Sequence, residues 1–350
     1  MRAAVMREGR IVADTLPDPE PEAGQVLVRT LACGICGSDL HALRHADKMV
    51  EAARDSGVPT FDFDPGRDVV FGHEFCAEVV DFGPGTLRNL AAGSRVCSMP
   101  ILFHPGGVSA VGYSNQYPGG YGELMVLSEP LLLPVPDGLA PEDAALTEPM
   151  AVGVHAVAMA RMAKNDAALV VGCGPVGLAV IAALRLAEHG PIVAADFSPR
   201  RRALAEELGA DAVVDPAAER PVQAWQRAAG ARQPVVFECV GVPGVIHELM
   251  REVPRGARIV VAGVCMEEDR IQPMLGVNKE LSLQFVLGYT PEEFATALGA
   301  IAEGRIPVAS LVTGRVGVED VAGAFDALAN PDAHAKILVE PAGDAPSGLG

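Results

Sequence analysis

The sequence predicts an α/β protein in which a β-rich first part precedes a doubly wound parallel sheet. Three observations lead to this prediction. Gly and Pro repeatedly interrupt strand-like runs in the first part of the chain. Beyond about residue 150, short apolar runs alternate with amphipathic helical patterns, which is the rhythm of parallel βαβ units. A glycine-rich turn joins the first of these runs to the helix that follows.

The first part is assigned from its alternation of apolar and polar residues. Val26–Thr30 alternates as a strand does, and Val69–Phe82 contains a second strand-like run. Between them, Ala46–Ser56 has the composition of a short, exposed helix.

The second part is assigned from its apolar runs and the helical patterns between them. The expected strands are Ala168–Val171, Ile192–Ala195, Ala212–Val214, Val235–Cys239, Arg258–Val261 and Ser282–Val286. The expected helices are Gly177–Glu188, Arg200–Leu208, Val222–Ala229, Glu292–Glu303 and Val318–Leu328, and Ala335–Val339 is expected to be the last strand. Right-handed crossovers then give a parallel sheet.

Composition excludes several classes of function. The chain has 350 residues and a formal net charge of −18, so a polyanionic partner such as nucleic acid or an anionic membrane surface is not expected. Seven cysteines, an odd number in a long chain, fit a reducing compartment, and we expect a cytoplasmic protein. The uncharged stretch 167–184 contains Gly172, Gly174, Pro175 and Gly177, which argue against a continuous membrane helix.

A dinucleotide-binding motif follows the first strand of the second part. Gly172, Gly174 and Gly177 form a G-x-G-x-x-G pattern, with Pro175 and Val176 between the last two glycines. The glycines allow a tight turn, a close approach of the backbone to a pyrophosphate, and close packing of helix on strand. The helix N-terminus adds free N–H groups and a positive dipole end.

Asp196 ends the next expected strand, 19 residues after Gly177. Its carboxylate would bind both ribose hydroxyls of adenosine and repel a 2′-phosphate, which favours NAD over NADP. Ser198, Arg200 and Arg201 form the competing interpretation, because they offer donors that a 2′-phosphate would accept.

The densest polar cluster is Cys33–His41, with the sequence CGICGSDLH. Its C-x-x-C lacks the small βαβ setting of a redox motif, and there is no second C-x-x-C to complete a zinc knuckle. His73-Glu74 and Glu148-Pro149 add further metal-ligand types elsewhere in the chain.

Together these segments resemble the zinc-dependent medium-chain dehydrogenase/reductase superfamily over nearly the whole chain. The matching pieces are GICGSDLH at 34–41, GHE at 72–74, GGYGEL at 119–124, TEPMAVGVHA at 147–156 and VVGCGPVGL at 170–178. The resemblance implies a GroES-like catalytic domain at 1–151 and 293–350, and a Rossmann NAD-binding domain at 152–292. It also implies an alcohol or polyol dehydrogenase that forms a homodimer or homotetramer.

The resemblance also implies the roles of the site residues. Cys36, His73 and Glu148 would hold one catalytic zinc, with Glu148 bound directly or through water. Glu74 would be an acidic neighbour that binds or releases the metal, and Asp39 would support the imidazole of His73.

Three more roles follow from the resemblance. Ser38, then the nicotinamide ribose, then His41 would relay the proton of the alcohol to solvent. Arg201 would contact the cofactor, and Lys336 is either a pyrophosphate contact or a solvated lysine. Only Cys97 stands in the stretch where many members carry four cysteines, so no structural zinc is expected.

Two other functions compete with this interpretation. A zinc-free quinone or enoyl reductase of the same superfamily would lack the pattern of Cys36, His73 and Glu74. A non-catalytic NAD-binding protein would keep the glycine motif without needing the ligands and relay residues.

Overall fold

The computed structural model describes residues 1–330 and 332–343 of the chain. Contacts divide the chain into two compact units: Met1–Glu148 with the segment from Leu311 onward, and Pro149–Ser310. None of the helices in these described residues is long and apolar enough to cross a membrane.

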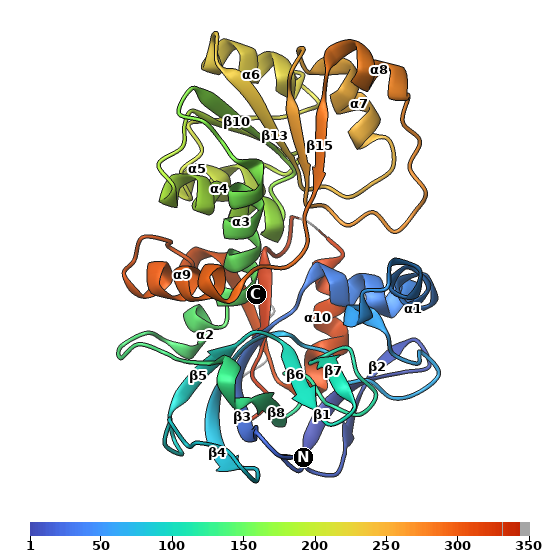
Figure 1. The fold of residues 1–350 in the computed structure, drawn as a ribbon, viewed down its shortest axis with the longest axis vertical. Helices are drawn as coiled ribbons and strands as arrows, with labels where there is room; N and C mark the ends of the chain where they lie inside the picture. The colour runs from blue at the N-terminus through green and yellow to red at the C-terminus, as the bar shows by residue number, and fades with distance from the viewer. Residues whose placement is uncertain (331, 344–350) are drawn as a thin grey trace. The chain divides into compact units, whose positions relative to one another are not determined.

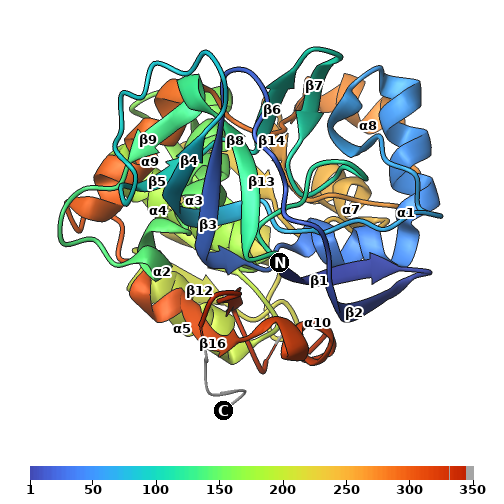
Figure 2. The same cartoon turned by 90° about the horizontal axis from the view of Figure 1, so that it is seen from below.

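A mixed seven-stranded sheet forms the centre of the first unit (Figures 1 and 2). Its order is β16 (Val312–Val316), β17 (Lys336–Val339), β3 (Gln25–Gly34), β4 (Glu74–Phe82), β5 (Arg95–Ser98) and β9 (Leu132–Pro134), and β8 (Leu124–Ser128) also pairs with β3. Two hairpins accompany it: β1 (Arg2–Arg7) with β2 (Arg10–Thr15), and β6 (Ile101–His104) with β7 (Gly107–Ala110). The strand β3 therefore places its C-terminal end between β4 and β17.

Helices of different lengths connect these strands. They are α1 (Gly37–Ser56), η1 (Pro59–Phe61), η2 (Glu129–Leu131), α2 (Pro141–Ala144), η4 (Val318–Asp320) and α10 (Val321–Leu328). The helix α1 begins nine residues earlier than expected and is kinked at His45, where φ is −137° and ψ is 34°. Its polar first turn follows β3 directly, because the Asp39 carboxylate accepts a hydrogen bond from the backbone N–H of Cys36.

The second unit contains a parallel six-stranded sheet, as the sequence predicted, and its strand order is that of a doubly wound fold. Its strands are β12 (Ala212–Val214), β11 (Ile192–Ala195), β10 (Asp166–Val171), β13 (Gln233–Glu238), β14 (Arg258–Val261) and β15 (Ser282–Phe285), in that order. Its helices are α3 (Thr147–Ala160), which begins in the first unit, then α4 (Pro175–Leu186), α5 (Pro199–Glu207), α6 (Pro221–Ala229), α7 (Val245–Glu252), α8 (Pro273–Lys279) and α9 (Pro291–Ala302). The short helix η3 (Ala309–Leu311) lies at the boundary where the chain returns to the first unit.

Packing places α9 in the second unit, so the later segment of the first unit starts at Leu311 and not at residue 293. Phe294, Leu298 and Ile301 bury the apolar face of α9. His155 Nδ1 of α3 lies 2.8 Å from Glu293 Oε2, and this contact joins the two helices. The apolar residues that follow Pro291 therefore belong to this unit's interior.

Candidate active site

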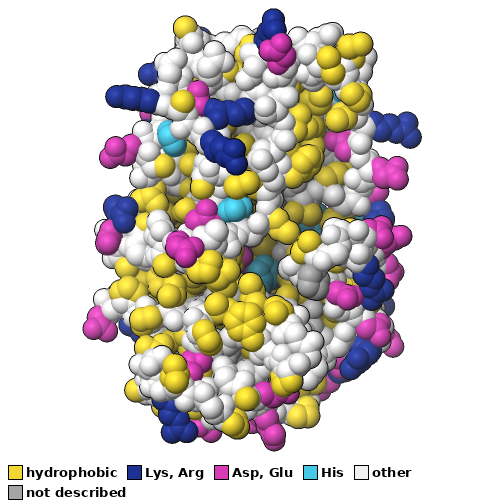
Figure 3. Space-filling model, viewed as in Figure 1, with side chains coloured by type: hydrophobic (Ala, Val, Ile, Leu, Met, Phe, Trp, Pro, Cys, Tyr) yellow, Lys and Arg dark blue, Asp and Glu magenta, His cyan; other side chains and the backbone are white. Residues whose placement is uncertain are grey.

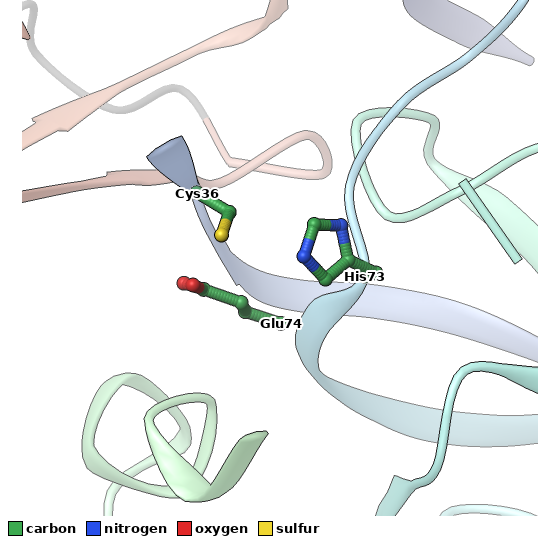
Figure 4. A group of neighbouring side chains, drawn as sticks. All are labelled: Cys36, His73 and Glu74. Atoms are coloured by element: carbon green, nitrogen blue, oxygen red, sulfur yellow. The ribbon is translucent and has the colours of Figure 1, made fainter. Parts of the chain in front are cut away.

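Three metal-ligand side chains converge at the end of β3 in the first unit. One ligand atom each from Cys36, His73 and Glu74 lies within 4.8 Å of the others. Figure 4 shows these three side chains side by side. Antiparallel pairing of β3 with β4 sets Gly34 opposite Glu74, which brings the residues after β3 beside those that begin β4. A side chain at residue 34 would clash with the Glu74 carboxylate, so this approach requires glycine.

A buried carboxylate, Asp39, stands behind the imidazole. Its Oδ1 lies 2.9 Å from the hydroxyl of Tyr113, and its Oδ2 accepts hydrogen bonds from Tyr121 (2.6 Å) and from the backbone of Cys36 (3.1 Å). Burial raises the pKa of Asp39, but His73 and these hydrogen bonds outweigh burial and lower it. Asp39 is therefore held as a carboxylate that faces the ring.

The ring of His73 is oriented by that carboxylate. Its Nδ1 lies 3.4 Å from Asp39 Oδ1, an ion-pair distance that is longer than a good hydrogen bond. Burial lowers the pKa of His73, but Asp39 and Cys36 outweigh it and raise the pKa well above 6.5. The negative charges that raise the pKa of His73 also attract a metal cation. A thiol together with an imidazole suits zinc better than Mg²⁺ or Ca²⁺.

Lys336 does not have either role expected from the sequence. It is 3% exposed, and its ammonium lies 2.7 and 2.6 Å from the two carboxylate oxygens of Glu74 and 3.1 Å from the carbonyl oxygen of Ile35. These three acceptors use all three N–H donors, so none is left for a pyrophosphate, and burial excludes a solvated lysine. Burial alone would lower the pKa of Lys336, but the charge of Glu74 outweighs it and raises the pKa above 10.5.

Glu148 lies in the first turn of α3 and is buried, with 8% of its surface exposed. It does not belong to the group of ligand atoms within 4.8 Å, although its charge adds to those that raise the pKa of Lys336. The buried surroundings of Lys336 thus include two carboxylates, from Glu74 and Glu148.

The two expected relay residues lie on the first turns of α1. Ser38 Oγ is 2.8 Å from the hydroxyl of Tyr113. His41 is half-buried, and its pKa is lowered by burial and by the neighbouring charges of His45 and Arg44. A lowered pKa keeps the imidazole neutral and able to accept a proton near pH 7.

The second unit carries the glycine-rich loop between β10 and α4. Gly172 has a φ of +90°, a conformation in which a residue with a side chain would be strained. A Cβ at Gly177 would clash with the carbonyl oxygen of Gly172. Gly174 precedes Pro175 and Val176, which open α4. The loop therefore has the close turn and the free helix N-terminus that a pyrophosphate requires.

Asp196 lies beside this loop, directly after β11. Its Oδ2 accepts a hydrogen bond from the N–H of Cys173 (2.7 Å), and its Oδ1 accepts one from the N–H of Ser198 (2.8 Å). The guanidinium of Arg201 passes near Gly174, and its buried Nε has no hydrogen-bond partner in the described residues. An acidic group, Asp196, and a basic group, Arg201, therefore lie next to the same loop.

Two tyrosines, Tyr113 and Tyr121, contribute to the site although the sequence assigned neither of them a role. Both rings are buried, and both hydroxyls contact Asp39. The GGYGEL segment marked Tyr121, but no local pattern marked Tyr113. Cys97 is buried, and its thiol donates a hydrogen bond to the carbonyl oxygen of Ala144 (3.2 Å).

A thiol–imidazole–carboxylate group in one unit and a dinucleotide loop in the other are the two sites that a metal-dependent dehydrogenase needs. Comparison with known families agrees with this class. Residues 22–137 match the family described as alcohol dehydrogenase GroES-like domain, and residues 175–303 match that described as zinc-binding dehydrogenase. The chain belongs to the zinc-dependent medium-chain alcohol and polyol dehydrogenases.

Individual relatives cover nearly the whole chain. It is 34% identical to (R,R)-butanediol dehydrogenase of Bacillus subtilis over 93% of this chain and 95% of that protein. It is 27% identical to sorbitol dehydrogenase of Bos taurus, over 91% and 90% of the two chains.

Two solved structures are similar to the whole fold. The crystal structure of 2R,3R-butanediol dehydrogenase from Bacillus subtilis superposes with a TM-score of 0.82 at 32% identity, over 97% of this chain and 99% of that one. A putative zinc-binding dehydrogenase from Sinorhizobium meliloti, bound to NADP, superposes with a TM-score of 0.80 at 27% identity, with the same coverage.

Proposed function

We propose that this protein oxidises a small diol or polyol to the corresponding carbonyl compound, with NAD as hydride acceptor and one zinc ion per chain. The convergence of Cys36, His73 and Glu74 carries this proposal. The relatives named butanediol and sorbitol dehydrogenases support the substrate class. The three ligand types also argue against a zinc-free reductase and a non-catalytic dinucleotide-binding protein.

The residues of the first unit would hold zinc as a neutral centre. Cys36 and His73 supply a thiolate and an imidazole, and Glu148 supplies the third ligand, directly or through water. A thiolate and a carboxylate balance the charge of Zn²⁺, while Lys336 balances Glu74. Glu74 would then bind the metal only after it leaves Lys336.

When bound, zinc would supply a Lewis acid for the alcohol hydroxyl, and the dinucleotide would supply the hydride acceptor. The protein's own residues orient the groups and move the proton. Asp39 orients the ring of His73. Ser38 accepts a proton at Oγ and passes its own hydrogen onward, and the neutral imidazole of His41 receives a proton at the outer end of the relay.

The dinucleotide would bind to the second unit. The loop at Gly172, Gly174 and Gly177 would face the pyrophosphate, and Asp196 would accept hydrogen bonds from the adenosine ribose. The carboxylate of Asp196 supports NAD, whereas Arg201 and the NADP-bound relative support NADP. Initial rates with each cofactor decide between them, and a higher kcat/KM with NADP would overturn the NAD proposal.

We propose a homodimer or homotetramer formed through β15, the strand at the end of its sheet. Apolar side chains near this edge are exposed, among them Phe285 (64%) and Leu287 (62%). Sedimentation of wild type and Phe285→Lys tests this, and a monomeric wild type would refute it. On the face shown in Figure 3, the basic side chains lie among acidic and apolar ones, which supports a small-molecule partner over nucleic acid.

All seven cysteines are free in the structure, which supports our proposal of a cytoplasmic location. The activity is tested by adding butane-2,3-diol, sorbitol and simple secondary alcohols to purified protein and following NADH absorbance. We expect turnover that a zinc chelator abolishes and added zinc restores. Turnover that survives complete removal of zinc would overturn the proposal.

A further inference from the structure

Tyr113 is the side chain that joins the expected proton relay to the carboxylate behind the metal-ligand histidine. Its hydroxyl oxygen lies 2.8 Å from Ser38 Oγ and 2.9 Å from Asp39 Oδ1. Tyr113 stands 75 and 74 residues away from these partners in the sequence.

An aromatic cluster fixes the ring of Tyr113. The ring is 4% exposed, and its centroid lies 4.8 Å from that of Phe61, 6.2 Å from Phe63, 5.8 Å from Phe71 and 5.2 Å from His73. A ring that is packed on several sides keeps its hydroxyl at one place.

Asn115 fixes the backbone of the same segment. Its Oδ1 accepts a hydrogen bond from the N–H of Asp64 (2.7 Å), and its Nδ2 donates to the carbonyl oxygens of Asp64 (3.0 Å) and Asp68 (3.2 Å). The segment that carries Tyr113 is thereby tied to the residues just before β4.

Donor counting sets the direction of the two hydrogen bonds. A tyrosine hydroxyl has one hydrogen, and a carboxylate oxygen can only accept. Tyr113 therefore donates to Asp39, and its oxygen accepts the hydrogen of Ser38. The lone pairs of Ser38 Oγ are then free to accept a proton from another hydroxyl. As they do so, the hydrogen of Ser38 turns away from Tyr113 and passes to the next group of the relay, so Ser38 remains a neutral hydroxyl.

We propose that Tyr113 is a positioning residue that holds Ser38 Oγ ready to accept the alcohol proton and holds Asp39 against His73. This inference rests on the proposed dehydrogenase function. It assigns a positioning role to a residue that lies outside the group of Cys36, His73 and Glu74.

Tyr121 provides a matched control. Its hydroxyl donates a 2.6 Å hydrogen bond to the other oxygen of Asp39, and the structure records no hydrogen bond from it to Ser38 in the described residues. Tyr113→Phe and Tyr121→Phe each delete one hydroxyl that binds Asp39, but only Tyr113→Phe also releases Ser38.

The test compares the two variants in metal affinity and in turnover. Zinc affinity, measured by competition with a chromogenic chelator, should fall about tenfold or less in both variants, because Asp39 loses one hydrogen bond in each. In zinc-saturated enzyme, kcat should fall about tenfold for Tyr113→Phe, at nearly constant KM, and clearly less for Tyr121→Phe. Equal kcat values for the two variants would overturn the proposal.

A second substitution separates an action through Ser38 from a general structural effect. In a Ser38→Ala background, Tyr113→Phe should lower kcat no further, because the partner it positions is gone. A full tenfold loss in that background would contradict the proposal. If Tyr113→Phe fails to fold, Asn115→Ser replaces it, since it loosens the same segment and should likewise act only when Ser38 is present.

The activity of the wild type shows whether a negative result contradicts this inference or the proposed function. A wild type that oxidises none of the panel alcohols overturns the dehydrogenase proposal. An active wild type together with a fully active Tyr113→Phe overturns only the role of Tyr113.

Discussion

Replacing Lys336 with Met should strongly destabilise the metal-free protein. The substitution removes three hydrogen bonds at 2.6, 2.7 and 3.1 Å and leaves the fully buried carboxylate of Glu74 without its cation. Breaking a buried ion pair on one side costs about 3–5 kcal/mol. We therefore expect the free energy of unfolding of the first unit to fall by about that amount.

Glu74→Gln is the matched change, because it removes the charge with little change of volume. The double variant should be more stable than Lys336→Met alone, by roughly 1–3 kcal/mol, since no unpaired charge then remains buried. Added zinc should recover part of the stability of Lys336→Met, because the released carboxylate regains a cation.

Urea unfolding can be followed separately in the two units. Three of the four tyrosines, at 113, 117 and 121, lie in the first unit, so near-UV circular dichroism is weighted toward it. The single tryptophan, Trp225, is buried in the second unit, and its fluorescence reports on that unit. A loss below about 1 kcal/mol in Lys336→Met, or a double variant no more stable than the single one, would refute the reasoning.

The pH dependence of this effect follows from the raised pKa of Lys336. The folded protein holds its proton more tightly than the unfolded chain, whose lysine titrates near 10.5. The stabilisation is therefore fully present below that pH and is lost as the pH rises through the higher, folded value. The difference between wild type and Lys336→Met should stay constant between about pH 7 and pH 9.

Three further substitutions test the roles assigned to single residues. Cys36→Ser should lower zinc affinity and turnover by at least about 100-fold while the fold persists, and normal zinc binding would exclude Cys36 as a ligand. Asp196→Ala should lower kcat/KM for NAD about tenfold and raise the relative use of NADP, and an unchanged cofactor ratio would contradict its role at the ribose. His41→Ala should lower kcat about tenfold at pH 7 and less at higher pH, where hydroxide takes the proton. Because the pKa of His41 is lowered, its ring is neutral and can accept a proton at pH 7. A pH profile of kcat that the substitution leaves unchanged would exclude His41 from the relay.

The sequence predicted the second unit well because its signals are local. The strands β11, β12 and β14 have the residue bounds that their apolar runs indicated. Each buried parallel strand is a short apolar run, so a few consecutive residues determine it. The start of α1 was not predicted, because its polar first turn depends on a hydrogen bond from Cys36 to Asp39 and on burial against two tyrosines.

The candidate site divides in the same way. Cys36, His73 and the glycine loop lie in short motifs that the sequence displays directly. The pairing of Lys336 with Glu74 joins residues 262 positions apart, and the contact of Tyr113 with Ser38 spans 75 positions. Nothing near either residue in the sequence indicates its partner, because β17 and the loop before β8 reach the site only through the folded sheet.

Zinc stoichiometry with activity is the most direct test of the central claim. We predict about one zinc per wild-type chain, and NAD-dependent oxidation of a diol or polyol that disappears on chelation and returns with zinc. Cys36→Ser, purified in parallel, should contain almost no zinc and show almost no turnover. Two zinc ions per chain would contradict the single-site account, and full activity in zinc-free protein would contradict the role of zinc itself.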